Sequence, residues 1–167
     1  MARVGIVGHI GCTVLVLTLG GCYRPPAEDH LVQVFESRRA DFDELARMAA
    51  TDKAFYRIPA QGIPPKGLPP SRFEQYEGLF HTLGVEGGVN WGIPSHTDGL
   101  FVIVSSMVPF PGKSRMIGYA YLPTAPAALS SRLPLAGSPF EIHRTSGHRI
   151  AFRGLEDHWY LFYDVEW

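Results

Sequence analysis

Apolar and charged residues follow a helical period in the stretch after residue 27. Apolar side chains recur every three or four positions, at Leu31, Val34, Phe35, Phe42, Leu45, Met48 and Ala49. Charged side chains lie between them, at Glu36, Arg39, Asp43, Glu44 and Arg47. This spacing places the apolar residues on one face of a helix. It predicts one long amphipathic helix over residues 28–51.

A proline-rich segment separates this helix from a second one. A short strand is predicted over residues 54–58, and residues 59–70 then contain prolines that lack the amide donor regular structure needs. Ser71 and Glu74 have the spacing of a capping box, which predicts a helix starting there. The apolar residues of that helix are Phe73, Tyr76, Leu79, Phe80 and Leu83. Gly84 is its predicted end.

Everything after Gly84 has the pattern of β-strands. Runs rich in β-branched and aromatic residues cover 89–93, 100–107, 116–122, 140–145, 149–153 and 159–165. Turns are predicted at Asp98-Gly99, Pro111-Gly112 and Ser146-Gly147. The last run alternates, with Trp159, Leu161, Tyr163 and Val165 on one face and Tyr160, Phe162 and Asp164 on the other. We therefore expect an α+β fold, with two N-terminal amphipathic helices packed on one face of an antiparallel sheet of about five or six strands.

The beginning of the chain is typical of a lipoprotein signal peptide. Arg3 precedes an apolar run over residues 10–19, a length that suits a secretory signal better than a membrane span. The run ends in Leu19-Gly20-Gly21-Cys22, which resembles the bacterial lipobox. That resemblance implies cleavage between Gly21 and Cys22 and lipid attachment at Cys22, with acyl chains as the membrane anchor. The alternative is a buried N-terminal helix or an uncleaved anchor.

Three segments follow from this interpretation. Residues 1–21 are the predicted signal peptide, residues 22–27 a short extended tether that contains Pro25-Pro26, and residues 28–167 a single α+β domain. Tyr23 follows the cysteine, where an Asp is associated with retention in the inner membrane. The expected location is therefore the outer membrane with the domain facing the periplasm, and the inner membrane or the cell surface stays open.

Composition excludes several classes of protein. The chain has 167 residues, 46% of them hydrophobic, and a formal net charge of −1, which indicates a globular protein without the basic excess that nucleic-acid binding requires. Removal of residues 1–21 takes away one of the two cysteines, Cys12, and the lipid would occupy Cys22. No free thiol would remain for catalysis, for a disulfide or for a zinc finger.

Candidate catalytic and metal-binding residues are few. Ser95, His96 and Asp98 are the residue types of a hydrolase triad, but a triad needs convergence in space, so turn chemistry is the favoured interpretation. His143 and His148 would lie diagonally on one face of a predicted hairpin, and Glu141 or Glu156 would be the third ligand of a metal there. Ordinary surface histidines are the simpler interpretation. We expect no metal and no cofactor.

The same predicted hairpin carries a possible binding surface. Arg144, Arg149 and Arg153 would form a cationic stripe, for which a solvated sheet face is the simpler explanation and an acidic partner the alternative. The tentative binding residues are His143, His148, His158, Arg144 and Arg149. The aromatic residues Trp91, Trp159 and Trp167 would either line a binding surface or pack in the core.

Several blocks of the chain resemble a family of small proteobacterial lipoproteins of uncharacterised function. The blocks are the lipobox, Phe35–Leu45, Phe73–Phe80, Gly118–Tyr121 and His158–Tyr163. The resemblance implies an envelope location and carries no activity, cofactor or catalytic residue.

Three function hypotheses follow. The first is a lipid-anchored cell-envelope protein with a non-enzymatic binding or structural role, whose partners are the membrane and another envelope component. The second is an immunity lipoprotein that neutralises a periplasmic toxin. The third is a periplasmic hydrolase or metalloenzyme that uses a histidine cluster.

Overall fold

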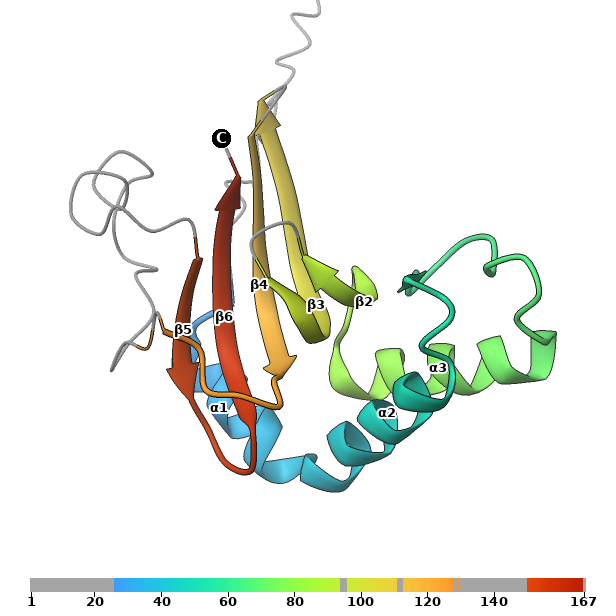
Figure 1. Ribbon diagram of the computed structural model, residues 1–167, viewed down its shortest axis with the longest axis horizontal. Helices are drawn as coiled ribbons and strands as arrows, with labels where there is room; N and C mark the ends of the chain where they lie inside the picture. Colours follow the sequence, from blue (N-terminus) through green and yellow to red (C-terminus); the bar gives the residue numbers. More distant parts are fainter. Residues whose placement is uncertain (1–25, 94–95, 111–112, 128, 130–149, 167) are drawn as a thin grey trace, which may run out of the picture.

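The computed structural model describes residues 26–93, 96–110, 113–127, 129 and 150–166, in which it has three helices and six strands (Figure 1). The helices are α1 (Glu28–Ser37), α2 (Arg39–Thr51) and α3 (Pro70–Leu83). The strands are β1 (Arg57–Ile58), β2 (Gly88–Ile93), β3 (His96–Phe110), β4 (Lys113–Tyr121), β5 (Ile150–Gly154) and β6 (Trp159–Glu166). The fold is α+β, as predicted. No helix within these ranges has the length and apolar character needed to cross a membrane.

The strands form one antiparallel sheet in the order β1-β2-β3-β4-β6-β5. Strands β2, β3 and β4 follow one another in sequence and in space, as hairpins do. Strand β6 lies beside β4, which leaves β5 at the edge of the sheet. The predicted strand over 140–145 lies outside the described residues, as do the predicted turns at 111–112 and 146–147.

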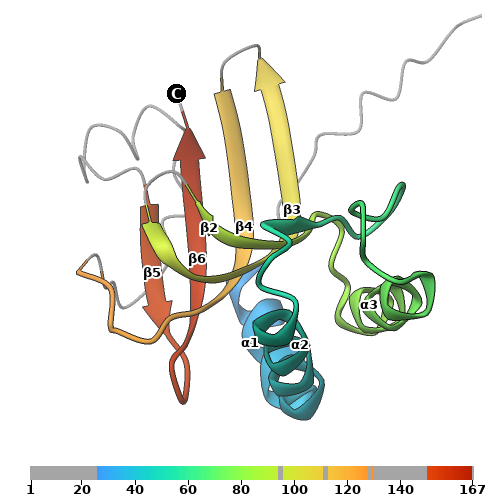
Figure 2. The same cartoon turned by 45° about the vertical axis from the view of Figure 1, so that its right-hand side comes forward.

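The helices cover one face of the sheet, with α3 beside α2 and away from β5 (Figure 2). An aromatic cluster joins the two layers. The ring of Phe42 lies 4.4 Å from that of Tyr119 in β4 and 5.4 Å from that of Trp159 in β6, measured between centroids. Tyr119 also donates a hydrogen bond to the backbone oxygen of Leu31 in α1, at 2.8 Å. The prediction that helices cover one face is confirmed.

The opposite face of the sheet has its own smaller apolar cluster. Phe101 of β3 and Phe162 of β6 are fully buried there, with ring centroids 5.2 Å apart. Ile93, at the end of β2, belongs to the same cluster as Phe152 of β5. The sheet is therefore strongly curved, with β2 and the start of β3 bending over β4 and β6 (Figure 2). The predicted alternation in β6 is confirmed, because Leu161 faces the helices and Phe162 the second cluster.

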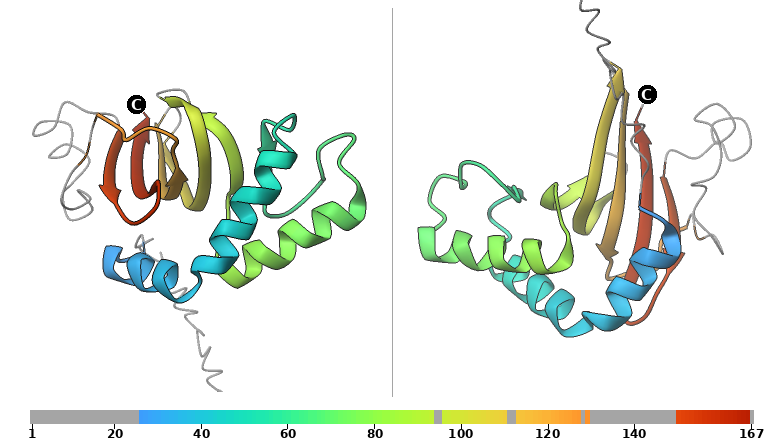
Figure 3. Two further views of the ribbon diagram at one scale, coloured as in Figure 1. Left: turned by 60° about the horizontal axis from the view of Figure 1, so that its bottom comes forward. Right: turned by 180° about the vertical axis from the view of Figure 1, so that it is seen from behind.

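The predicted helix over 28–51 is broken at Arg38, which has φ −125° and ψ 24° and separates α1 from α2. Two turns of a straight helix would separate Phe35 from Phe42 by about 10.5 Å along its axis. In the structure their ring centroids are 5.3 Å apart, and both rings contact Trp159. Because of the break, α1 and α2 run in different directions, as the left panel of Figure 3 shows, and the Phe35 and Phe42 rings both contact Trp159.

The predicted capping box at Ser71 and Glu74 is wrong. Helix α3 begins one residue earlier, at Pro70, and no side-chain hydrogen bond caps it. Proline at the first helical position has the φ value of a helix and lacks only a donor that would have no helical partner there, so it starts the helix without a cap. The predicted end is confirmed, because Gly84 adopts the left-handed conformation at φ 66°.

Candidate functional site

Four side chains form a row across the helix-covered face of the sheet. Trp91 of β2 pairs with Leu100 of β3, Leu100 with Tyr121 of β4, and Tyr121 with Trp159 of β6. Leu100 and Trp159 are buried, whereas Trp91 and Tyr121 are partly exposed. Because neighbouring strands are about 4.8 Å apart, the backbones of Trp91 and Tyr121 are separated by about 10 Å.

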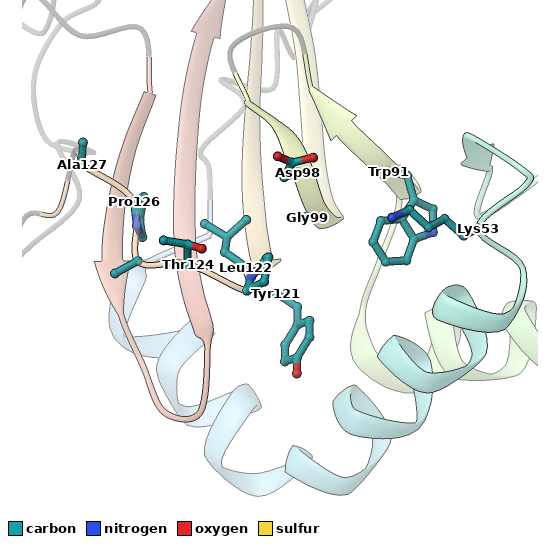
Figure 4. A pocket seen from close by; sticks show the side chains of 11 residues that line it. Lys53, Trp91, Asp98, Gly99, Tyr121, Leu122, Thr124, Pro126 and Ala127 are labelled. Carbon is teal, nitrogen blue, oxygen red and sulfur yellow. The ribbon is translucent and has the colours of Figure 1, made fainter.

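A cleft of about 620 Å³ opens at this row (Figure 4). Trp91 and Tyr121 lie on its two sides, and Lys53 reaches it from the loop after α2. The remaining wall is the extended segment that follows β4. The lining residues are Lys53, Trp91, Asp98, Gly99, Tyr121, Leu122, Pro123, Thr124, Ala125, Pro126 and Ala127.

An irregularity follows Trp91 in β2. The register with β3 shifts between Trp91 and Ile93, at Gly92, whose φ is 75°. Residues two apart in a regular strand share a face, but here Trp91 belongs to the helix-side cluster and Ile93 to the opposite one. A bulge of this kind bends a strand and re-aims its side chains. It turns Ile93 to the opposite face, whereas Trp91 keeps the helix-side face that it shares with Val89.

Contacts with α2 and the loop after it hold the Trp91 ring in place. Its Nε1 donates to the backbone oxygen of Ala49, 3.1 Å away. That oxygen lies in the last turn of α2, where carbonyls have no partner within the helix. The Nζ of Lys53 lies 4.9 Å from the ring centroid, a cation–π contact. The indole therefore has its polar edge satisfied and offers its apolar surface to the cleft.

Tyr121 is supported by Trp159, at 5.2 Å between ring centroids, and by His158, at 6.2 Å with the two rings nearly perpendicular. His158 is one of the predicted binding residues. It is exposed and lies in the turn between β5 and β6, beside the cleft. Its backbone oxygen accepts a hydrogen bond from the nitrogen of Leu122, which fixes the chain that leaves β4.

The turn that presents His158 has an uncommon backbone conformation. Trp159 N donates to Glu156 O at 2.9 Å, and the central residues Asp157 and His158 have φ values of 46° and 70°. These are the features of a type I′ turn, which favours glycine or asparagine at such positions. Arg39, the first residue of α2, binds the Asp157 carboxylate at 3.0 Å and holds the turn against the helices.

The polar groups of the cleft carry both signs of charge. Lys53, Asp98 and Thr124 are exposed. In the described part of the chain, no hydrogen bond or ion pair joins these three residues to one another, and none binds the Asp98 carboxylate to a partner. Asp98 and Gly99 were expected in a turn. They lie instead inside β3, where Gly99 has φ 145° and its missing side chain leaves room for Leu122. Because Asp98 belongs to β3, it lies at the cleft.

Two other clefts are smaller and differ in their charges. In one of about 460 Å³, Arg39 is already paired with Glu156, at 3.7 Å, and with Asp43 and Asp157 outside it. The other, of about 480 Å³, lies between α1 and the end of α3 and is lined in part by His30 and His81. The cleft at Trp91 is larger than these two, and its Lys53 and Asp98 form no ion pair with the residues that the structure describes.

Most predicted site residues fall outside the described part of the chain. These are Gly21, Cys22, Ser95, His143, Arg144, His148 and Arg149, together with Trp167. Arg153, expected on a cationic stripe, instead forms an ion pair with Glu28 of α1. Glu156, a candidate metal ligand, pairs with Arg39. Among the described residues, no group of three His, Cys, Asp or Glu side chains is placed to hold a metal ion.

The sequence pointed to Trp91, Asp98 and His158 but not to the cleft. Lys53, Tyr121 and Thr124 were not candidates, and only a tertiary contact between the loop after α2 and the sheet brings Lys53 to Trp91. No local pattern marks the cleft, because strand pairing and the contact with Lys53 bring its residues together. Comparisons with protein-family models, with curated proteins and with solved structures find no match to this chain.

Proposed function

We propose that this protein is a lipid-anchored protein of the cell envelope whose folded domain binds another envelope component in the Trp91–Tyr121 cleft without transforming it. The observation that carries the proposal is the cleft itself, in which two aromatic rings in contact with neighbouring residues lie beside Lys53 and Asp98, which form no ion pair in the described part of the chain. Sites that bind small ligands are concave and mostly apolar, with a few polar groups that orient the ligand. The lining of this cleft fits that description.

The polar groups of the cleft support binding rather than catalysis. Nucleophilic catalysis needs a nucleophile and a base within hydrogen-bond reach of each other. Lys53, Asp98 and Thr124 share no such bond in the described part of the chain. His158 contacts Tyr121 by its ring and reaches the cleft only through that residue.

The lipid anchor is proposed from the residues before the domain. Helix α1 starts at Glu28, six residues after Cys22. Six residues span at most about 20 Å, so acyl chains on Cys22 would keep the domain close to the membrane surface. The proposed location is the outer membrane, with the domain in the periplasm.

The anchor is tested by replacing Cys22. We expect Cys22→Ser to be unacylated and to leave the membrane fraction, with Ser37→Ala, in the exposed end of α1, as the control that stays. Membrane association that survives Cys22→Ser, or mass spectrometry without acyl chains on the wild type, would contradict the anchor.

The binding role is tested separately with immobilised full-length protein and solubilised envelope extract. We expect one component to be retained by the wild type and by Lys66→Ala, an exposed lysine outside the cleft, and to be lost from Trp91→Ala. Equal retention by the wild type and Trp91→Ala would contradict a role for the cleft. Turnover of an envelope substrate that requires Asp98 would contradict the non-enzymatic proposal.

A further inference from the structure

We infer that the ligand of the Trp91–Tyr121 cleft is an uncharged saccharide of two or three sugar rings. This inference rests on the proposed binding function and names the ligand of the same cleft. It is argued from the aromatic walls, from the polar rim and from the size of the cleft.

The walls suit a ligand with flat apolar faces. The Nε1 of Trp91 is engaged by Ala49, so the indole has only its ring surface to offer. Tyr121 is held by Trp159 and His158, so little freedom would be lost when a ligand contacts it. The face of an aromatic ring carries partial negative charge, and the C–H groups on the face of a pyranose ring carry partial positive charge. Stacking of sugar rings against these two walls follows from that complementarity.

The rim suits hydroxyl groups. Asp98 accepts hydrogen bonds only, Lys53 donates only, and Thr124 does both. A sugar presents hydroxyl groups around the edge of its ring, and each of them can donate and accept. Lys53 lies over Trp91 through an exposed cation–π contact, which is weak, so its flexible side chain can turn toward a ligand at small cost.

Charge and main-chain pairing disfavour other ligands. One cation and one anion at the rim give the cleft no net charge, so a phosphate or a nucleotide would meet the Asp98 carboxylate. An extended peptide gains affinity from main-chain hydrogen bonds along a strand. At Trp91 the main-chain donor is already used, because its backbone nitrogen donates to Tyr56 O at 2.8 Å.

The size of the cleft sets the length of the ligand. Its volume of about 620 Å³ lies within the range of about 300–1,000 Å³ that is usual for small-molecule sites. The cleft is open to solvent and not an enclosed cavity. A ligand of two or three rings fills such a cleft and leaves its ends in water.

The test is a titration of the full-length protein in detergent with a trimer of N-acetylglucosamine and with maltotriose, followed by tryptophan fluorescence and by calorimetry. We expect saturable binding of at least one of them. Trp91→Ala and Tyr121→Ala should weaken it by at least about tenfold. Trp91→Ala and Tyr121→Ala also remove packing within the protein, so two variants of exposed groups, Asp98→Asn and Lys53→Ala, are measured beside them. Each of these two should weaken binding several-fold. Ile63→Ala and Lys66→Ala change exposed side chains outside the cleft, so these controls should bind as the wild type does.

Absence of saturable binding at about 10 mM of either saccharide would overturn the inference. So would binding that Asp98→Asn, Lys53→Ala and Trp91→Ala all leave unchanged. A proline-rich peptide or an anionic ligand that binds where the saccharides do not would overturn the ligand class. The retention experiment with envelope extract then separates the two proposals: loss of retention in Trp91→Ala without saccharide binding removes the saccharide and keeps the binding function.

Discussion

The indole nitrogen of Trp91 donates a hydrogen bond to the backbone oxygen of Ala49, 3.1 Å away, and so ties the rim of the sheet to the last turn of α2. This bond satisfies a helix carbonyl that has no partner within the helix and at the same time fixes one wall of the cleft. Stability and the proposed binding site thus share one contact.

Replacing Trp91 with Phe should lower the free energy of unfolding by about 1–2 kcal/mol. The ring is largely kept, but the oxygen of Ala49 loses its donor, and a partly buried carbonyl without a partner is costly. Urea denaturation measures the change. Tyr56→Phe is the control, because its hydroxyl is 3.5 Å from its acceptor and its side chain is 60% exposed. An equal loss in both variants would contradict the importance of the Ala49 contact.

Replacing His158 with Gly should raise the free energy of unfolding by about 0.5–1 kcal/mol, because glycine adopts positive φ without strain. His158→Ala removes the same imidazole and keeps the strained backbone, so it should give no gain. Thermal unfolding of the two variants separates backbone strain from loss of the ring. Both variants should also weaken ligand binding, because both remove the imidazole that contacts Tyr121. A higher free energy of unfolding in His158→Ala would contradict backbone strain at this position.

Gly118→Ala should destabilise the protein by more than about 3 kcal/mol or prevent folding. Gly118 lies in the middle of β4, and a Cβ atom there would overlap the backbone oxygen of Val102 in β3. Gly154→Ala, at the end of β5, is the matched control, since its Cβ would meet nothing within 4 Å. Its free energy of unfolding, from denaturant titration, should change by less than about 0.5 kcal/mol. Similar effects in both would mean that the packing of β3 on β4 is not as described.

Stability should fall above pH 10. Burial raises the pKa of Tyr119, and burial together with a 2.8 Å hydrogen bond to Asp52 raises the pKa of Tyr76, both from the ordinary value of 10.0. Above that value the unfolded chain releases protons that the folded protein keeps. The free energy of unfolding is therefore unaffected by these groups below pH 10 and falls as the pH rises, by up to about 1.4 kcal/mol per pH unit for each tyrosine.

Denaturant titrations between pH 8 and about 11.5 measure this slope, with the pKa of an ordinary tyrosine near 10 as the reference point. In Tyr119→Phe the free energy of unfolding should fall less steeply with pH, by the contribution of one proton, about 1.4 kcal/mol per pH unit. This variant also loses the hydrogen bond to Leu31 O, so its stability is lower at every pH. A slope that is unchanged in Tyr119→Phe would contradict the role given to burial of this hydroxyl.

Local patterns were enough to predict much of the fold. The alternation in β6 and the end of α3 at Gly84 depend on period and on the conformational freedom of one residue, so they can be read without knowing what lies opposite. The break at Arg38 could not be read this way. Residues 28–51 have a continuous helical pattern, and only the curvature of the sheet that Phe35 and Phe42 share requires two helices.

The cleft forms only in the tertiary structure. The sequence by itself determined an α+β domain, the apolar faces of its elements and the residue pattern from which a lipid anchor is proposed. It did not bring Lys53, Trp91, Asp98 and Tyr121 together, because these residues belong to different elements and share no motif. Their meeting depends on the pairing of β2, β3 and β4 and on the Trp91–Ala49 hydrogen bond. Periodicity reports which face of an element is buried, whereas a site at the junction of several elements depends on how those faces are turned toward one another in space.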